Sequence, residues 1–154
     1  MKRTPLGRKS NSHVAECKDR IQALLRAIAI LRDGGCVLRF SEIQMEYGIK
    51  ECSGWRQDGE LILQYDHLKS RQFNVSFADI RLGVILCKGH HGWKHFTDAN
   101  KKLYDRILTK IVGPERAALW ERVENYRKTY LMTLWDWQKV EMALKQELVA
   151  QRAA

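Results

Sequence analysis

Two short segments of this chain carry the apolar pattern of buried strands, residues 60–65 (ELILQY) and residues 82–86 (LGVIL). Short apolar runs bounded by polar turns are typical of strands. The flanking stretches instead repeat apolar residues every three or four positions, as one face of a helix does. Two strands form no more than a hairpin, so helices must cover their apolar side chains. The sequence therefore predicts an α+β fold, with two short antiparallel strands and a helix embedded among helices.

The N-terminal part divides into an arm and a helix. Residues 1–13 are polar and basic with one proline, and we expect a flexible basic arm. Residues 14–33 follow as a helix, because Ile21, Leu24, Leu25, Ile28 and Leu31 recur on one helical face. Gly34 is available for a left-handed C-cap at its end.

The middle part, residues 34–98, is the predicted core. Residues 36–40 suggest a short strand or knuckle, and Ser41 is a candidate cap for a short helix over residues 42–47. Asp66 and His67 stand at the end of the first strand. Residues 68–78 are polar and predict a loop, and residues 87–96 have the character of a helix start.

The C-terminal part, residues 99–154, predicts two or three helices. Gly113 is expected to end the first of these helices, and Pro114 suits the first turn of the next. Thr133 and Asp136 have the spacing of a capping box before the last helix.

The chain is strongly basic, with 27 Lys and Arg residues, 18 Asp and Glu residues and a net charge of +9. The surplus lies at the two ends: residues 1–34 hold 8 basic and 3 acidic side chains, residues 35–100 hold 8 and 8, and residues 101–154 hold 11 and 7. A neutral centre between basic flanks favours a polyanionic partner. Ordinary solubility is the alternative explanation.

No segment has the roughly 20 consecutive apolar residues of a membrane span, and no apolar segment of a secretory signal follows the basic N-terminus. We therefore expect a cytoplasmic protein without a membrane partner. Four cysteines in such a chain favour metal binding or burial over disulfide bonds.

Four of the five histidines fall between His67 and His95. On a helix, His91 and His95 would share one face one turn apart, which makes half of a divalent metal site. Asp66, at a neighbouring strand end, would add a carboxylate ligand. Such a site with open positions can hold a catalytic metal together with a phosphate oxygen. Strand alternation would point His67 the other way, free to act as a base on water.

The segments ELILQYDHLKSR and ADIRLGVILCKGHHGWKH resemble the HNH endonucleases, also called ββα-metal or His-Me finger nucleases. The shared features are an apolar strand ending in Asp-His, a loop, a second apolar strand, and a Cys-x-x-His-His run that opens a helix. The preceding helix, the Arg-Asp-Gly-Gly-Cys lead-in and the basic helical tail are similar to phage recombination endonucleases of the NinG-like branch.

The resemblance implies a DNA endonuclease that hydrolyses phosphodiester bonds with one divalent metal ion, Mg²⁺, Mn²⁺ or a similar ion. His67 matches the general base, and Asp66, His91 and His95 match metal ligands. The substrate would be duplex or branched DNA in phage recombination or processing, in the cytoplasm of a bacterial host. The sequence leaves the oligomeric state open.

One position departs from the family pattern. The family's middle asparagine falls nine residues before the last motif histidine, which here is Leu82. Asp79, or Asn74, is a candidate replacement that would hold His67 in place, with Asp79 favoured by position. Without such a group, the alternative is a non-catalytic, zinc-stabilised nucleic-acid-binding module. A third hypothesis is a helical partner-binding protein whose histidines are incidental.

A second metal, a structural Zn²⁺, is implied by the paired knuckles of many family members. Cys87-x-x-His90 matches one knuckle, whereas Cys36 lacks its close partner, so Cys52 would complete a Cys₃His quartet. The alternative is that Cys36 and Cys52 are simply small buried residues. We expect Cys17, inside the first helix, to be a packing residue.

Basic and aromatic residues around the motif have two interpretations each. Lys69, Arg71, Arg81 and Lys88 are candidate phosphate-binding residues, or else solvated side chains. Trp93 and Phe96 are expected in the core rather than stacked on bases.

Overall fold

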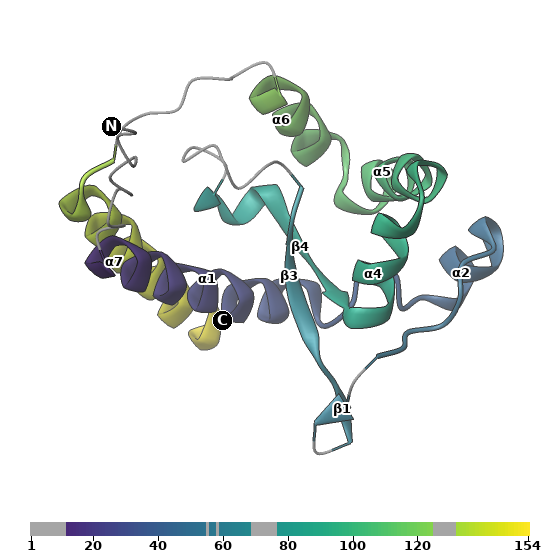
Figure 1. Cartoon of the computed structure of the whole chain (residues 1–154), viewed down its shortest axis with the longest axis horizontal. Coiled ribbons are helices and arrows are strands. Elements are labelled where there is room, and N and C mark those ends of the chain that lie inside the picture. The colour runs from purple at the N-terminus through teal and green to yellow at the C-terminus, as the bar shows by residue number, and fades with distance from the viewer. Residues whose placement is uncertain (1–11, 55, 58, 69–76, 125–131) are drawn as a thin grey trace, which may run out of the picture.

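The computed structural model describes residues 12–54, 56–57, 59–68, 77–124 and 132–154. Two small antiparallel sheets lie among helices, so the predicted α+β class is confirmed (Figure 1). The helices are α1 (Ser12–Asp33), α2 (Ser41–Tyr47), α4 (Lys88–Phe96), α5 (Asp98–Val112), α6 (Pro114–Glu124) and α7 (Leu134–Ala153), with a 3₁₀ turn η1 (Ile80–Leu82). The strands are β1 (Arg56–Gln57), β2 (Glu60–Leu61), β3 (Leu63–His67) and β4 (Gly83–Cys87).

The two strands expected from the sequence meet as an antiparallel pair. β3 pairs with β4, with Asp66 opposite Val84 and His67 opposite Gly83. The first predicted strand is broken at Ile62, however, and its start pairs with Arg56–Gln57 in a small separate hairpin. This hairpin, β1 and β2, extends away from the helices in Figure 1. The prediction that residues 60–65 form one strand was therefore wrong in extent.

The β3–β4 pair separates two hydrophobic clusters. Val84 and Leu86 pack in a cluster with Tyr104, Ile107 and Leu108 of α5. The alternate side chains, Tyr65 and Ile85, pack with the apolar faces of α1 and α7. Successive side chains of a strand point to opposite faces. Neighbouring residues at the end of β3 therefore face different halves of the protein.

α1 begins at Ser12, so it takes in the last two residues of the predicted arm; residues 1–11 lie outside the described residues. The apolar face of α1 packs on α7. Glu141 of α7 also forms an ion pair with Arg20 of α1. That carboxylate accepts hydrogen bonds from Arg20 at 3.0 Å, and its pKa is lowered to about 2, mainly by Arg20. Gly34, at a φ of 63°, follows the helix as predicted.

Other local predictions had mixed outcomes. Residues 36–40 form a turn rather than a strand, and Phe40 is the N-cap of α2, so Ser41 is its first residue instead of its cap. The capping box of Thr133 and Asp136 is present at the start of α7. Within the described ranges, none of the helices has the length and apolar character needed to cross a membrane.

Candidate metal centres

In the described residues, two groups of side chains that could hold a metal ion come together. The first is Cys36, Cys52, Cys87 and His90, and the second is Asp66, His91 and His95. Within each group, the potential ligand atoms all lie within 4.8 Å of one another. α4 contributes to both groups. His90 and His91 are consecutive on this helix and point to different sides of it, so His90 belongs to the first group and His91 to the second.

In the first group, three sulfur atoms surround one ring nitrogen. His90 Nδ1 lies 3.3 Å from the Sγ atoms of Cys36 and Cys87 and 3.7 Å from Sγ of Cys52. The turn after α1, the segment before β1 and the junction of β4 with α4 each supply ligands. Because thiolates and imidazole are the donors of structural zinc sites, this Cys₃His group suits such an ion. The structure thus brings together the quartet expected from the sequence.

The outer nitrogen of His90 is also fixed. Nε2 donates a hydrogen bond to the carbonyl oxygen of Lys50 at 2.8 Å. A carbonyl can only accept, so the proton of the neutral ring is on Nε2 and the lone pair on Nδ1 faces the sulfurs. Metal-binding histidines usually have such a backbone partner on their other nitrogen. Sequence reasoning missed Lys50, since it acts through its backbone and any residue type could do so.

The pKa values of the three cysteines shift in different directions. The hydrogen bond from Cys36, supported by one from the backbone N–H of His90, lowers the pKa of Cys87 to about 3. The same hydrogen bond, together with burial, raises the pKa of Cys36, and burial raises that of Cys52. The lowered pKa favours the thiolate form at Cys87, and metal binding would take the protons from the remaining thiols.

Close backbone packing holds this cluster together. Gly89 N donates to Ser53 O at 2.8 Å. A Cβ atom on Gly89 would lie 2.2 Å from Ser53 Oγ and 2.7 Å from Ser53 O, so no larger residue fits. Residues 52–54 thus lie directly against the first turn of α4. The two glycines, Gly54 and Gly89, were the available sequence signal for this contact.

In the second group, a buried carboxylate meets two imidazoles. Asp66 is only 3% exposed, and its Oδ1 lies 3.5 Å from His91 Nε2. The rings of His91 and His95 have centroids 5.2 Å apart, as expected for residues one helical turn apart. His91 is half-buried and His95 is exposed. Burial, together with the charge on Lys94, lowers the pKa of His95, which keeps its ring in the neutral form that binds metals.

Asp66 has two further partners that sequence reasoning missed. Lys94 Nζ donates to Oδ1, and Tyr104 Oη donates to Oδ2 at 2.6 Å. Burial raises the pKa of Asp66, but the hydrogen bonds from His91, Lys94 and Tyr104 outweigh it and hold the pKa below its usual value. Asp66 is therefore an ionised carboxylate.

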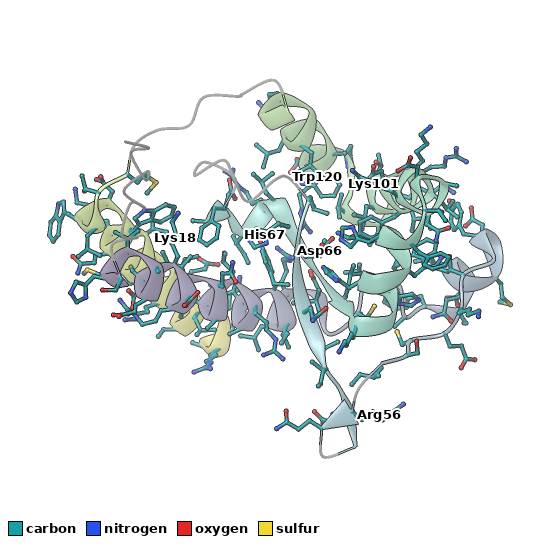
Figure 2. The ribbon with its side chains drawn as sticks, in the orientation of Figure 1. Lys18, Arg56, Asp66, His67, Lys101 and Trp120 are labelled. Atoms are coloured by element: carbon teal, nitrogen blue, oxygen red, sulfur yellow. The ribbon has the colours of Figure 1, made fainter. Side chains whose placement is uncertain are left out.

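His67 faces the opposite side of the strand from Asp66, toward α1 and α7 (Figure 2). Its Nε2 lies 3.2 Å from the carbonyl oxygen of Phe77, and its ring stacks on the Phe77 ring at 5.6 Å between centroids. Since the carbonyl accepts, Nε2 carries the proton in the neutral ring and Nδ1 carries the lone pair. The ring orientation is thus fixed, and Nδ1 is itself a buried atom, so a role as general base requires that water reach it.

Asp79, the candidate replacement for the motif asparagine, lies just before η1. Its carboxylate accepts hydrogen bonds from the Arg81 backbone and guanidinium at 2.7–2.9 Å, which caps η1. One hydrogen bond of His67 is donated by Nε2 to the Phe77 carbonyl oxygen. Leu82, at the position of the motif asparagine, is a fully buried core residue. Asn74 lies outside the described residues.

The candidate phosphate-binding residues are only partly described. Lys69 and Arg71 fall outside the described residues. Arg81 is paired with Asp79, although 63% of its side chain is exposed, and Lys88 is exposed at the start of α4. Trp93 packs against the core, as expected, whereas Phe96 is 85% exposed, so the prediction of a core residue was wrong there. Phe96 is the last residue of α4, beyond the part of the helix that the sheet covers.

Comparisons with protein-family models, curated proteins and solved structures found no match to this chain.

Proposed function

We propose that this protein is a metal-dependent DNA endonuclease of the HNH type, which hydrolyses phosphodiester bonds. The observation that carries the proposal is the convergence of Asp66, His91 and His95 within 4.8 Å. A carboxylate and two imidazoles form a donor set that first-row divalent ions accept with positions left over for water and substrate. Mg²⁺ or Mn²⁺ bound there would supply Lewis-acid stabilisation of the charge that develops on the scissile phosphate and the leaving oxygen.

The remaining chemistry falls to His67. When water reaches the buried Nδ1, its lone pair would take the proton from the attacking water, while the Phe77 carbonyl holds the ring through Nε2. Asp66 and His67 are consecutive, so their Cα atoms are about 3.8 Å apart although their side chains diverge. The proposal therefore requires the scissile phosphate to lie at the end of β3, where the two residues are adjacent along the chain.

The proposed role of the Cys₃His group is structural zinc binding. It joins the turn after α1, the segment before β1 and the first turn of α4, and α4 carries both imidazoles of the second group. All four potential ligand positions are filled by protein side chains, which is typical of structural rather than catalytic zinc. Zinc would thereby fix the position of His91 and His95 relative to Asp66.

The charge of the chain supports a DNA substrate. The net charge is +9, and α5 exposes Lys101, Lys102 and Arg106. Lys101 is close enough to contribute to the lowered pKa of His95, which puts positive charge beside the proposed catalytic site. Contacts of this kind grip phosphates without reading sequence, so binding should weaken steeply with salt. Within this proposal, processing of recombining phage DNA in a bacterial host is the biological setting.

The experiment is nicking of supercoiled plasmid and of a branched DNA by zinc-loaded protein. We expect conversion to the nicked form with Mg²⁺ or Mn²⁺ and none when EDTA replaces the added ion. Asp66→Asn should be inactive, because the variant loses the anionic ligand at nearly constant size. If neither substrate is cut under any of these conditions, the proposal fails.

A second candidate function is a non-catalytic nucleic-acid-binding module. Two observations favour it: Leu82 is buried at the position of the motif asparagine, and Lys94 already neutralises Asp66. This function predicts DNA binding that is unchanged in Asp66→Asn, together with no cleavage by the parent protein. The same plasmid experiment, with a binding measurement beside it, separates the two functions.

A further inference from the structure

Besides its contact with His91, Asp66 has a hydrogen-bond partner at each carboxylate oxygen. Oδ1 accepts from the Lys94 ammonium and Oδ2 from the Tyr104 hydroxyl. Lys94 is itself 7% exposed, and its Nζ lies 5.0 Å from the centroid of the Tyr104 ring. A buried lysine on the helix that carries both imidazoles is unusual, because ammonium groups are rarely removed from water unless they are paired.

The ammonium contacts the carboxylate oxygen that the proposed metal would use. Oδ1 is the carboxylate oxygen that lies 3.5 Å from His91 Nε2, so it is the oxygen directed at the ligand group. A divalent ion held by Asp66, His91 and His95 would share this oxygen with Lys94. Two cations at one buried carboxylate oxygen repel each other strongly, since little water is present to screen them.

We infer that Lys94 is an internal competitor of the metal: its ammonium occupies Asp66 in the metal-free protein, and metal binding displaces it. Lys94 thereby sets the affinity of the site for divalent metal ions. This inference rests on the proposed function only in taking Asp66, His91 and His95 as the metal ligands. The flexible four-carbon stem of a lysine lets the ammonium leave without moving α4. The competition makes the site weak for divalent ions, although its three ligands are already assembled.

The test is Mn²⁺ binding to zinc-loaded protein, followed by the loss of the electron paramagnetic resonance signal of free Mn²⁺. Zinc fills the sulfur-rich group first, and Mn²⁺ prefers oxygen and nitrogen ligands, so the titration reports the second group. We expect Lys94→Met to tighten Mn²⁺ binding by about tenfold or more, because it removes the competing charge and keeps the apolar stem. Lys94→Arg, which retains the charge, should bind no more tightly than the parent protein.

The matched control is Lys102→Met, which removes one exposed charge on α5 and should leave the Mn²⁺ affinity within about twofold of the parent. If Lys94→Met binds Mn²⁺ no more tightly than the parent, or if no variant binds Mn²⁺, the inference is overturned. Lys94→Met removes the charge partner of the buried Asp66 and is expected to be less stable without metal. A melting temperature that rises more with Mn²⁺ in Lys94→Met than in the parent supports the inference independently.

Failure of the inference and failure of the proposed function are distinguishable. Tighter Mn²⁺ binding in Lys94→Met with no DNA cleavage by the parent would support the competition and contradict the nuclease. Cleavage by the parent with equal Mn²⁺ affinity in both proteins would contradict the competition alone.

Discussion

His67→Ala is expected to slow DNA cleavage by about 10²–10⁴-fold, the usual contribution of a general base. The physical reason is that His67 is the imidazole at the end of β3 whose ring is held by the Phe77 carbonyl, with its lone pair on Nδ1. Mn²⁺ affinity should be unchanged, because His67 faces the other side of the strand from Asp66. Initial rates of plasmid nicking at saturating Mn²⁺ measure the effect.

The control is His13→Ala, which removes an imidazole that is 73% exposed near the start of α1 and should cleave at the parent rate. Equal rates for His67→Ala and the parent would remove His67 from the mechanism. A loss of cleavage that is matched by a loss of Mn²⁺ binding would instead give His67 a role at the metal site.

Cys87→Ser is expected to abolish zinc binding and to unfold the half of the protein that contains α4. Structural zinc binding in small domains is worth about 10–16 kcal/mol, which is comparable with or larger than the entire stability of a typical domain, about 5–15 kcal/mol. Cys87 has the lowered pKa in the cluster and is fully buried at the junction of β4 and α4. Zinc content by elemental analysis and thermal unfolding by circular dichroism are the measurements.

Cys17→Ser provides the control for zinc content. Cys17 is buried in α1, donates a hydrogen bond to Glu141, and lies on the opposite side of the β3–β4 sheet from the Cys₃His group. It should retain one zinc ion per chain even if its stability falls. A Cys87→Ser protein that keeps both its zinc and its melting temperature would contradict the structural role of the cluster.

A pair of glycines in α4 tests the packing of the same cluster without touching a ligand. Gly89→Ala should destabilise the protein by about 1–3 kcal/mol, because its Cβ would overlap Ser53. Gly92→Ala meets no atom within 4 Å and should stabilise the helix by about 0.5–1 kcal/mol. Equal effects of the two substitutions in chemical denaturation would show that residues 52–54 do not pack against α4.

The sequence predicted the features that depend on neighbouring residues alone, such as helix faces and helix caps. The three- and four-residue spacing of Ile21, Leu25 and Ile28 predicted the buried face of α1, and the spacing of Thr133 and Asp136 predicted the capping box. Leu31, expected on the same face, is 48% exposed near the end of the helix, so its prediction was wrong. The break of the first strand at Ile62 was missed, since both of its halves have strand propensity and only their pairing partners differ.

In the candidate sites, the ligand residues were predicted from the sequence, whereas their hydrogen-bond partners were not. Residue types and spacing brought Asp66, His91 and His95 together as a hypothesis, and these residues do converge. The partners of Asp66 were not predictable, because a lysine on an amphipathic helix is expected in solvent and Tyr104 is distant along the chain. Likewise, the carbonyls of Lys50 and Phe77 orient two histidines through backbone atoms that every residue type possesses.

The central claim is that Asp66, His91 and His95 share one divalent ion. Pulsed electron paramagnetic resonance of Mn²⁺ bound to zinc-loaded protein tests it most directly, since it detects nitrogen nuclei coupled to the ion. We expect couplings from two imidazole nitrogens, reduced to one in His91→Ala and in His95→Ala. Bound Mn²⁺ without any imidazole coupling, or no bound Mn²⁺ at all, would contradict the claim.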